Sequence, residues 1–170
     1  YKVTGVQTCA LPISLLAEFF GVSATQMHSL ILGEHGDSMV PIWSTACVDG
    51  VPLPSLPGYD ATAVMKIFER TRKSGAEVIS LKAGAGYAVG VAILEVLKAL
   101  VYDSKAILPV STWQQGAYGL KDVCISVPTR LGKNGVEQIV EMELWPKESA
   151  ALSASADALL DTLAKVQVKA

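Results

Sequence analysis

The chain has 170 residues, a formal net charge of −2 and an apolar content of 51%. This length suits one domain with its own core, and the apolar content is too high for a disordered chain. The slightly negative net charge does not favour binding to nucleic acid or to an anionic membrane. No apolar run reaches the roughly 18 residues of a membrane span. The widely spaced Cys9, Cys47 and Cys124 suggest reduced thiols in a cytoplasmic protein rather than a disulfide framework.

The N-terminal part of the chain predicts the end of a helix and two strands. Residues 15–20 are typical of a last helical turn, with Gly21 as the C-cap. The apolar run Met27–Leu32 predicts a strand, and Val40–Val48 predicts a second strand that ends in the turn Asp49-Gly50.

Two helices are predicted next. Asp60 is a suitable N-cap for a helix over residues 61–79, whose apolar residues recur at three- and four-residue spacing. A second helix is predicted over residues 87–102. We expect its large apolar side chains to be buried, namely Val91, Leu94, Leu97 and Val101.

The remaining residues predict strands followed by a helix. Strands are expected over 106–113, 123–130 and 136–144, with Lys133-Asn134-Gly135 as a hairpin turn. Pro146 suits the first turn of a final helix. Strands in adjacent pairs, with long helices between and after them, indicate an α+β fold with antiparallel pairing.

The most distinctive stretch follows the first strand and reads Leu32-Gly33-Glu34-His35-Gly36-Asp37-Ser38. A histidine exchanges protons near neutral pH, and flanking glycines allow a sharp turn and the close approach of a ligand. The residues alone leave a second interpretation open, in which this is a tight turn whose polar side chains only face water.

This stretch resembles the active-site signature of the L-lactate/L-malate dehydrogenase family. Further similarities follow in the family's order, and they cover nearly all of its C-terminal, substrate-binding half. They are residues 69–78 (ERTRKSGAEV), 107–111, 116–119, 127–128 and 134–136. The resemblance implies the fold of that C-terminal domain without a Rossmann domain. It also implies a parent enzyme that uses NAD and a small 2-oxo or 2-hydroxy acid and forms homo-oligomers.

The resemblance assigns roles to three residues. His35 corresponds to the proton donor and acceptor for the substrate oxygen. Ala85 corresponds to a position beside the substrate side chain, and Val89 to one that flanks the nicotinamide, although Val89 is equally compatible with ordinary helix core. Malate is slightly favoured over lactate by residues 69–78 and the small Ala85, whereas GEHGDS with residues 42–44 points toward lactate, so the substrate stays open.

The first fourteen residues do not fit the resemblance. Residues 3–13 (VTGVQTCALPI) resemble the translation of a sequencing-library adapter, so we expect residues 1–14 to be a non-native scar and 15–170 to be the domain. The family's orienting aspartate and substrate-clamping arginine would fall on Thr8 and Leu11, which cannot replace them. We therefore expect this chain to be an inactive fragment. The alternative is a stand-alone, non-catalytic interaction or regulatory module that keeps the half-fold.

Three other features are weaker candidates. Residues 84–90 superficially match a G-x-G-x-x-G phosphate loop, but the third glycine is one position late and the preceding pattern is helical. His35, Asp37 and Cys47 lack a second ligand pair with zinc spacing, so no metal site is expected. His28 is expected to be exposed or structural.

Overall fold

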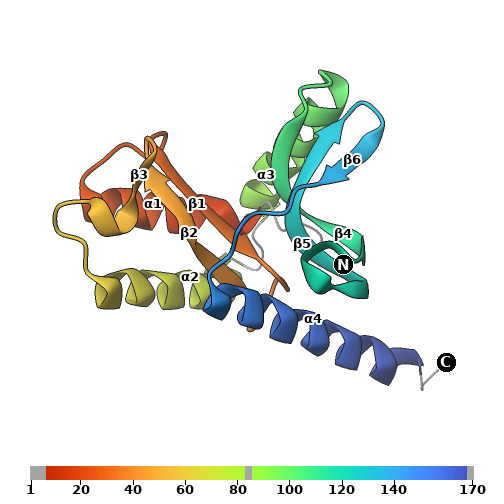
Figure 1. Ribbon diagram of the computed structural model, residues 1–170. Coiled ribbons are helices and arrows are strands. Elements are labelled where there is room, and N and C mark those ends of the chain that lie inside the picture. The colour runs from red at the N-terminus through yellow and green to blue at the C-terminus, as the bar shows by residue number, and fades with distance from the viewer. Residues whose placement is uncertain (1–6, 83–85, 168–170) are drawn as a thin grey trace.

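The computed structural model describes residues 7–82 and 86–167, which form two three-stranded antiparallel sheets and four α-helices (Figure 1). The α+β fold with antiparallel pairing is confirmed. The elements in chain order are α1 (Gln7–Phe20), β1 (Met27–Leu32), β2 (Val40–Val48), β3 (Val51–Pro52), α2 (Ala61–Lys82), α3 (Gly86–Val101), β4 (Ala106–Gln115), β5 (Lys121–Gly132), β6 (Gly135–Ile139) and α4 (Pro146–Gln167).

The first sheet, β1–β2–β3, packs against α1 and α2 around its own apolar cluster. Leu16 and Ala17 of α1 meet the sheet, and Val64 enters from α2. Two of the predicted caps are confirmed. Gly21, with φ of +66°, ends α1 in the arrangement in which Val22 N donates to Ala17 O at 2.9 Å, the bond of a Schellman motif.

The second cap starts α2. The Asp60 carboxylate accepts the Thr62 N–H at 2.8 Å, which satisfies one of the backbone donors that a helix start leaves unpaired. The predicted turn after β2 is confirmed as well. Asp49 and Gly50 have φ of +47° and +85°, as a two-residue hairpin turn of the primed type requires.

The two sheets meet at Gly33, the residue that follows β1. Gly33 N donates to Ser126 O of β5 at 3.0 Å, and Ser126 N donates back at 3.4 Å. Gly33 has φ of +90°, and a Cβ at this position would lie 2.7 Å from Ser155 Oγ of α4. Both the backbone conformation and the close approach of α4 therefore require glycine here.

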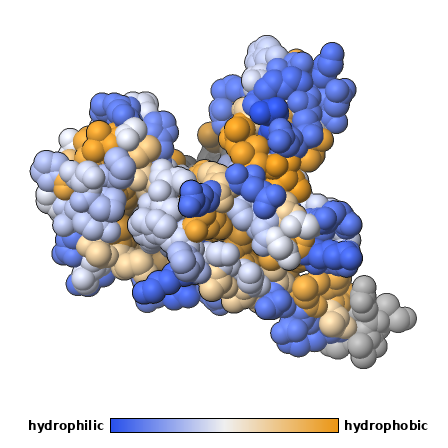
Figure 2. All heavy atoms as spheres, viewed as in Figure 1, coloured by the Kyte–Doolittle hydropathy of each residue, from blue (hydrophilic) through white to orange (hydrophobic). Residues whose placement is uncertain are grey.

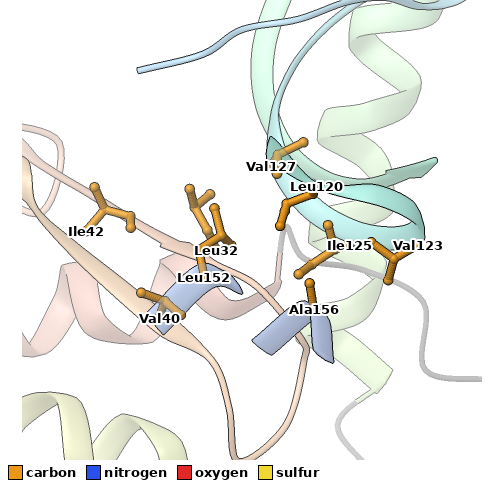
Figure 3. Close-up of a cluster of buried hydrophobic side chains, with 9 residues drawn as sticks. All are labelled: Leu32, Val40, Ile42, Leu120, Val123, Ile125, Val127, Leu152 and Ala156. Atoms are coloured by element: carbon orange, nitrogen blue, oxygen red, sulfur yellow. The ribbon is translucent and has the colours of Figure 1, made fainter. Parts of the chain in front are cut away.

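The main apolar cluster surrounds this junction (Figure 3). It combines side chains from both sheets with two from α4, so the helix covers the place where the sheets join. Its buried members are Leu32, Val40, Ile42, Leu120, Val123, Ile125, Val127, Leu152 and Ala156.

The position of α4 is set at its first turn, where β2 and the helix share one carboxylate. Glu148 is buried. Its Oε1 accepts the N–H groups of Trp43 and Ser44 at 2.7 and 2.9 Å, and its Oε2 accepts the Trp145 N–H at 3.0 Å. Bonds between a carboxylate and backbone donors are among the stronger hydrogen bonds in proteins, so Glu148 fixes α4 against β2. Pro146 opens the helix, as predicted.

The segment that leads into α4 is held by Tyr118. Its hydroxyl donates to Val140 O and accepts the Met142 N–H, each at 2.9 Å. Burial raises the pKa of Tyr118, so the hydroxyl stays protonated and can donate. This segment is not strand throughout, because β6 ends at Ile139, which corrects the predicted strand over 136–144.

The prediction that the large apolar residues of α3 are buried is wrong. Val91, Leu94, Leu97 and Val101 are 62, 48, 48 and 74% exposed, whereas Ala92 and Ala99 are buried. The charged residues of α3, Glu95 and Lys98, form an ion pair on one side of the helix. Apolar residues cover the other sides, so spacing alone could not identify the inward face, which holds the small Ala92 and Ala99. Figure 2 shows hydrophobic residues gathered on the part of the molecule that contains α3 and β4–β6.

Two expectations concern the chain as a whole. The first is the division between a non-native segment, residues 1–14, and the domain, residues 15–170. Helix α1 begins at Gln7 and continues past residue 14 without a break, so the structure does not mark this division, which stays a prediction. Among the helices within residues 7–82 and 86–167, none is both long and apolar enough to span a membrane.

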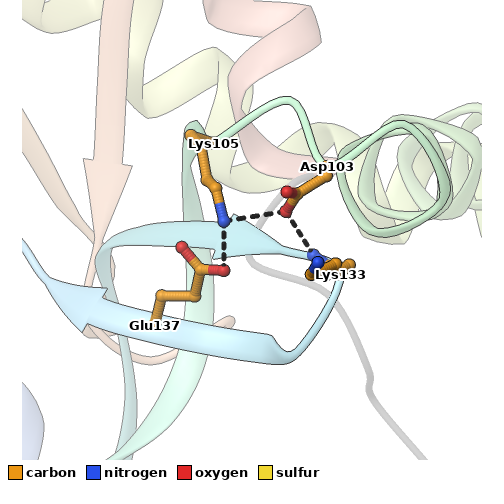
Figure 4. Close-up of polar contacts among 4 residues, drawn as sticks. All are labelled: Asp103, Lys105, Lys133 and Glu137. Carbon is orange, nitrogen blue, oxygen red and sulfur yellow. Dashed lines mark hydrogen bonds and ion pairs between the residues drawn. The ribbon is translucent and has the colours of Figure 1, made fainter.

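A surface cluster connects the turn after α3 to the hairpin of β5 and β6 (Figure 4). Lys105 Nζ lies 2.8 Å from Asp103 Oδ1 and 2.5 Å from Glu137 Oε1, and Lys133 N donates to Asp103 Oδ1 at 2.8 Å. The hydrogen bond from Lys105, and next the one from Lys133, lower the pKa of Asp103. The hydrogen bonds to Asp103 and then Glu137 raise the pKa of Lys105.

This cluster predicts a pH-dependent contribution to stability. A carboxyl with a lowered pKa stabilises the fold above its ordinary pKa and loses this contribution as the pH falls; an ammonium with a raised pKa stabilises it below its ordinary pKa and loses this as the pH rises. The loss of unfolding free energy in Lys105→Met should thus be constant between pH 3.8 and 10.5, the ordinary values, and shrink outside them. Urea unfolding of the wild type and of Lys105→Met over a series of pH values measures this loss, and Lys121→Met, at an exposed position, is the control. A loss of unfolding free energy that does not change with pH would contradict the prediction.

Gly33→Ala should cost more stability than Gly50→Ala. Both glycines have similar positive φ, +90° and +85°, but a Cβ at Gly50 meets nothing within 4 Å. The strain of the backbone conformation, about 1–3 kcal/mol, is therefore common to both variants. Only Gly33→Ala adds the clash with Ser155, worth about 1–3 kcal/mol more. Urea unfolding of the two variants measures the difference, and equal losses would show that α4 does not need this glycine.

Candidate functional site

His35 lies in the short loop between β1 and β2, two residues beyond the junction of the sheets. Leu32 and Val40, which bracket the loop, are paired across the two strands and buried. The loop is thus anchored at both ends in the main apolar cluster. His35 itself is half-buried, with its Nδ1 atom out of contact with solvent.

The loop is fixed by its own polar residues and by α4. Glu34 N donates to Ser155 Oγ at 2.8 Å, and Ser38 Oγ lies 3.1 Å from the same oxygen. Ser38 Oγ also donates to Glu34 Oε2 at 2.5 Å. A Cβ on Gly36 would lie 3.0 Å from Glu34 Oε1, so the glutamate carboxylate folds back over the loop. The conformation of the loop backbone around His35 thus depends on two glycines, Gly33 and Gly36, and on two polar residues, Glu34 and Ser38.

Helix α2 also contacts the loop, through one arginine. Arg72 Nη1 donates to the Asp37 carbonyl at 3.3 Å, while Nη2 pairs with Glu69 Oε2 at 2.7 Å. Asp37 contributes its backbone to this contact, and the residue is exposed. The loop is therefore in contact with three elements, β5 at Gly33, α4 at Glu34 and Ser38, and α2 at Asp37.

Of the two other residues assigned by resemblance, one lies on α3. Val89 is in the first turn of α3 and half-buried, so part of its surface remains accessible. Ala85 lies outside the described residues. Helix α2 ends at Lys82 and α3 begins at Gly86. The glycine-rich stretch thus follows a helix, as predicted, whereas a phosphate loop follows a strand.

The alternative ligands do not form a cluster. His28 is exposed on β1, opposite Cys47 in the strand pair. Cys47 and Cys124 are free thiols. Among the residues that the structure describes, no three histidine, cysteine, aspartate or glutamate side chains come together as metal ligands would.

Sequence reasoning missed the groups that hold the loop. Ser155, Ser126 and Arg72 are far from His35 in sequence, and none was predicted to contact it. One signal was available for Ser155. It lies among Leu152, Ala156 and Leu159 on the apolar side of the last helix, and a hydroxyl in such a place needs a buried partner.

The arrangement suits proton exchange with a ligand. The half-buried His35 lies on a backbone that is held before and after it, and imidazole can both accept and donate a proton near neutral pH. Such a group acts as a general acid or base when the reacting oxygen comes within hydrogen-bonding reach.

Comparison with known proteins agrees with this geometry. Residues 12–170 match the family model described as lactate/malate dehydrogenase, alpha/beta C-terminal domain. The chain is 42% identical over 168 residues to the malate dehydrogenase of Staphylococcus carnosus, covering 98% of this chain and 53% of the relative. It is 38% identical over 157 residues to the L-lactate dehydrogenase of Bifidobacterium animalis subsp. lactis, covering 89% and 49%.

A solved structure shows the same fold. The malate dehydrogenase from Salinibacter ruber matches with a TM-score of 0.91 and 37% identity, over 97% of this chain and 54% of that one. The chain spans about half the length of the relatives that it matches. Together with the loop that carries His35, these matches show that the chain belongs to the lactate/malate dehydrogenase family and corresponds to its C-terminal α/β domain.

Proposed function

We propose that this chain is the substrate-binding half of an NAD-dependent 2-hydroxyacid dehydrogenase, with His35 as the acid and base of the reaction. The observation that carries the proposal is the loop around His35, which is held by contacts with β5, α4 and α2 and in which His35 is half-buried. In the reducing direction His35 donates a proton to the 2-oxo oxygen, and in the oxidising direction it removes the proton from the 2-hydroxyl group.

The assignment of the cofactor and the substrate rests on the family resemblance. NAD, when bound, accepts or supplies the hydride at C2 of the substrate. Val89 would flank its nicotinamide with a half-buried apolar side chain, and Ala85 would lie beside the substrate. Malate is slightly favoured over lactate. Two of the residues that point toward lactate also have a packing role, because Ile42 is fully buried and the Trp43 ring packs edge-on to Phe68.

We further propose that the isolated chain has no measurable turnover. The family positions of the orienting aspartate and the arginine clamp hold Thr8 and Leu11. Threonine cannot stabilise an imidazolium as a carboxylate does, and leucine cannot form a bidentate pair with the substrate carboxylate. NADH oxidation by the pure chain, with oxaloacetate or pyruvate, would contradict this.

A chimera tests the catalytic role. Residues 15–170 are joined to the nucleotide-binding half of the Staphylococcus carnosus malate dehydrogenase, and NADH oxidation is followed by absorbance with oxaloacetate and with pyruvate. We expect turnover of oxaloacetate in excess of pyruvate. His35→Asn should lower kcat by about 10²–10⁴-fold, the usual contribution of a general acid or base.

The chain offers a matched control for this chimera. His28→Asn changes the other histidine, which is exposed on β1, and should leave kcat unchanged. A His35→Asn chimera with undiminished kcat would overturn the proposed role of His35.

The family resemblance also supports a homo-oligomer, for which the exposed side of α3 is the candidate contact. Leu94 and Leu97 are each 48% exposed, and monomeric proteins rarely expose large contiguous apolar patches. Sedimentation velocity should show the chain as a dimer or larger, and Leu94→Glu with Leu97→Glu should shift it to monomer. The exposed Lys66→Glu of α2 serves as the control, and a monomeric wild-type chain would contradict the proposal.

A further inference from the structure

We propose that Ser155 of α4 is a positioning residue, whose hydroxyl completes a closed ring of hydrogen bonds that fixes the loop carrying His35. The proposal rests on the proposed function only in the role that it gives to His35. Ser155 is fully buried and stands 121 positions from Glu34 in the sequence. Its contacts with the loop are therefore a product of the fold.

The direction of each bond in the ring follows from counting hydrogens. A serine hydroxyl has one hydrogen to donate and two lone pairs. The Glu34 N–H can only donate, so Ser155 Oγ accepts it at 2.8 Å. Ser38 uses its one hydrogen on Glu34 Oε2 at 2.5 Å. In the remaining contact, at 3.1 Å, Ser155 must therefore donate to Ser38.

The ring consequently begins and ends on Glu34, the residue before His35. It runs from the Glu34 N–H to Ser155, from Ser155 to Ser38, and from Ser38 back to the Glu34 carboxylate. Ser155 is its one member from outside the loop. Without it, the Glu34 N–H loses its acceptor and Ser38 loses its donor, so the loop is closed only when α4 is in place.

The glycines on either side of His35 fit this ring. A Cβ on Gly33 would lie 2.7 Å from Ser155 Oγ, and one on Gly36 would lie 3.0 Å from the Glu34 carboxylate. Each glycine thus leaves room for one member of the ring. The backbone before and after His35 is held, which restricts the imidazole to its own side-chain rotations.

Helix α4 is anchored independently of the loop, so it can serve as a fixed reference. Glu148 bonds it to β2, and Leu152 is buried in the main apolar cluster. Ser155 follows Glu148 by seven residues, about two helical turns, and so faces the same side. The position of α4 that Glu148 fixes therefore determines where the Ser155 hydroxyl contacts the loop.

Removing the hydroxyl tests the proposal in the chain as it stands. In ¹⁵N-labelled Ser155→Ala, we expect the Glu34 amide to exchange its hydrogen about 10- to 100-fold faster, because its part-buried N–H has lost its acceptor. The amides of β5 report global opening and should change much less. The His35 imidazole resonances should shift and broaden, which a role confined to overall stability would not produce.

Ser153→Ala is the matched control, since it makes the same change on the same helix at an exposed position. It should leave the Glu34 exchange rate and the His35 resonances at their wild-type values. Ser155→Ala would overturn the proposal if Glu34 exchange, relative to β5, stayed as in wild type.

A second variant keeps the test valid if Ser155→Ala does not fold. Ser38→Ala breaks the ring within the loop and leaves α4 unchanged, so it should also accelerate Glu34 exchange. Where both single variants fold, the double variant should add little to Ser155→Ala, because residues of one network are not additive. Full additivity, or no effect of Ser38→Ala, would contradict the ring.

The chimera then separates this proposal from the proposed function. Ser155→Ala should lower its kcat with KM for oxaloacetate unchanged, because a misplaced proton donor affects the reaction more than binding. The exchange measurement needs neither substrate nor cofactor. Unchanged Glu34 exchange overturns the positioning role, whereas undiminished turnover by His35→Asn overturns the catalytic role.

Discussion

The structure depends on the crossing of three elements at Gly33. There the end of β1 pairs with Ser126 of β5, and the Ser155 hydroxyl of α4 approaches to a distance that no side chain at position 33 would permit. The main apolar cluster surrounds the crossing and draws side chains from both sheets and from α4. Because close-packed interiors leave no slack for displaced atoms, the two sheets and the helix are positioned relative to one another at this point. The loop that carries His35 begins one residue later, so its first residue is held in place by the same contacts.

The polar interactions around the crossing extend its effect to the loop. Apolar packing fixes Leu32 and Val40, but it cannot satisfy the part-buried N–H of Glu34, which needs a hydrogen-bond acceptor. Ser155 supplies that acceptor, and Arg72 of α2 holds the Asp37 carbonyl. A catalytic group needs such support, since misplacement by about 1 Å can cost a hundredfold in rate. The proton chemistry proposed for His35 thus depends on residues from elements that are far apart in the chain.

Local signals made most elements predictable. The caps at Gly21 and Asp60, the turn at Asp49-Gly50 and the proline that opens α4 each act within a few residues, and each is confirmed. Helix α3 was predicted with the wrong face buried, because its apolar residues cover more than one side and the neighbouring elements determine which of these sides is buried. The site divides in the same way. His35 could be found from its motif, whereas Ser155 could not, since its contact with Glu34 spans 121 positions.

This division changes how the signature around His35 is understood. From the sequence alone, the glycines and polar residues of GEHGDS are all candidates for contact with a ligand. In the structure, Gly33 leaves room for Ser155, Gly36 leaves room for the Glu34 carboxylate, and Ser38 links the two. Much of the motif is therefore explained by how the loop is held against α4, and the half-buried His35 is the member left for the proposed role with a substrate. A similar heptapeptide without a serine on a neighbouring helix would lack the partner that closes the ring, and so would present its histidine on a looser loop.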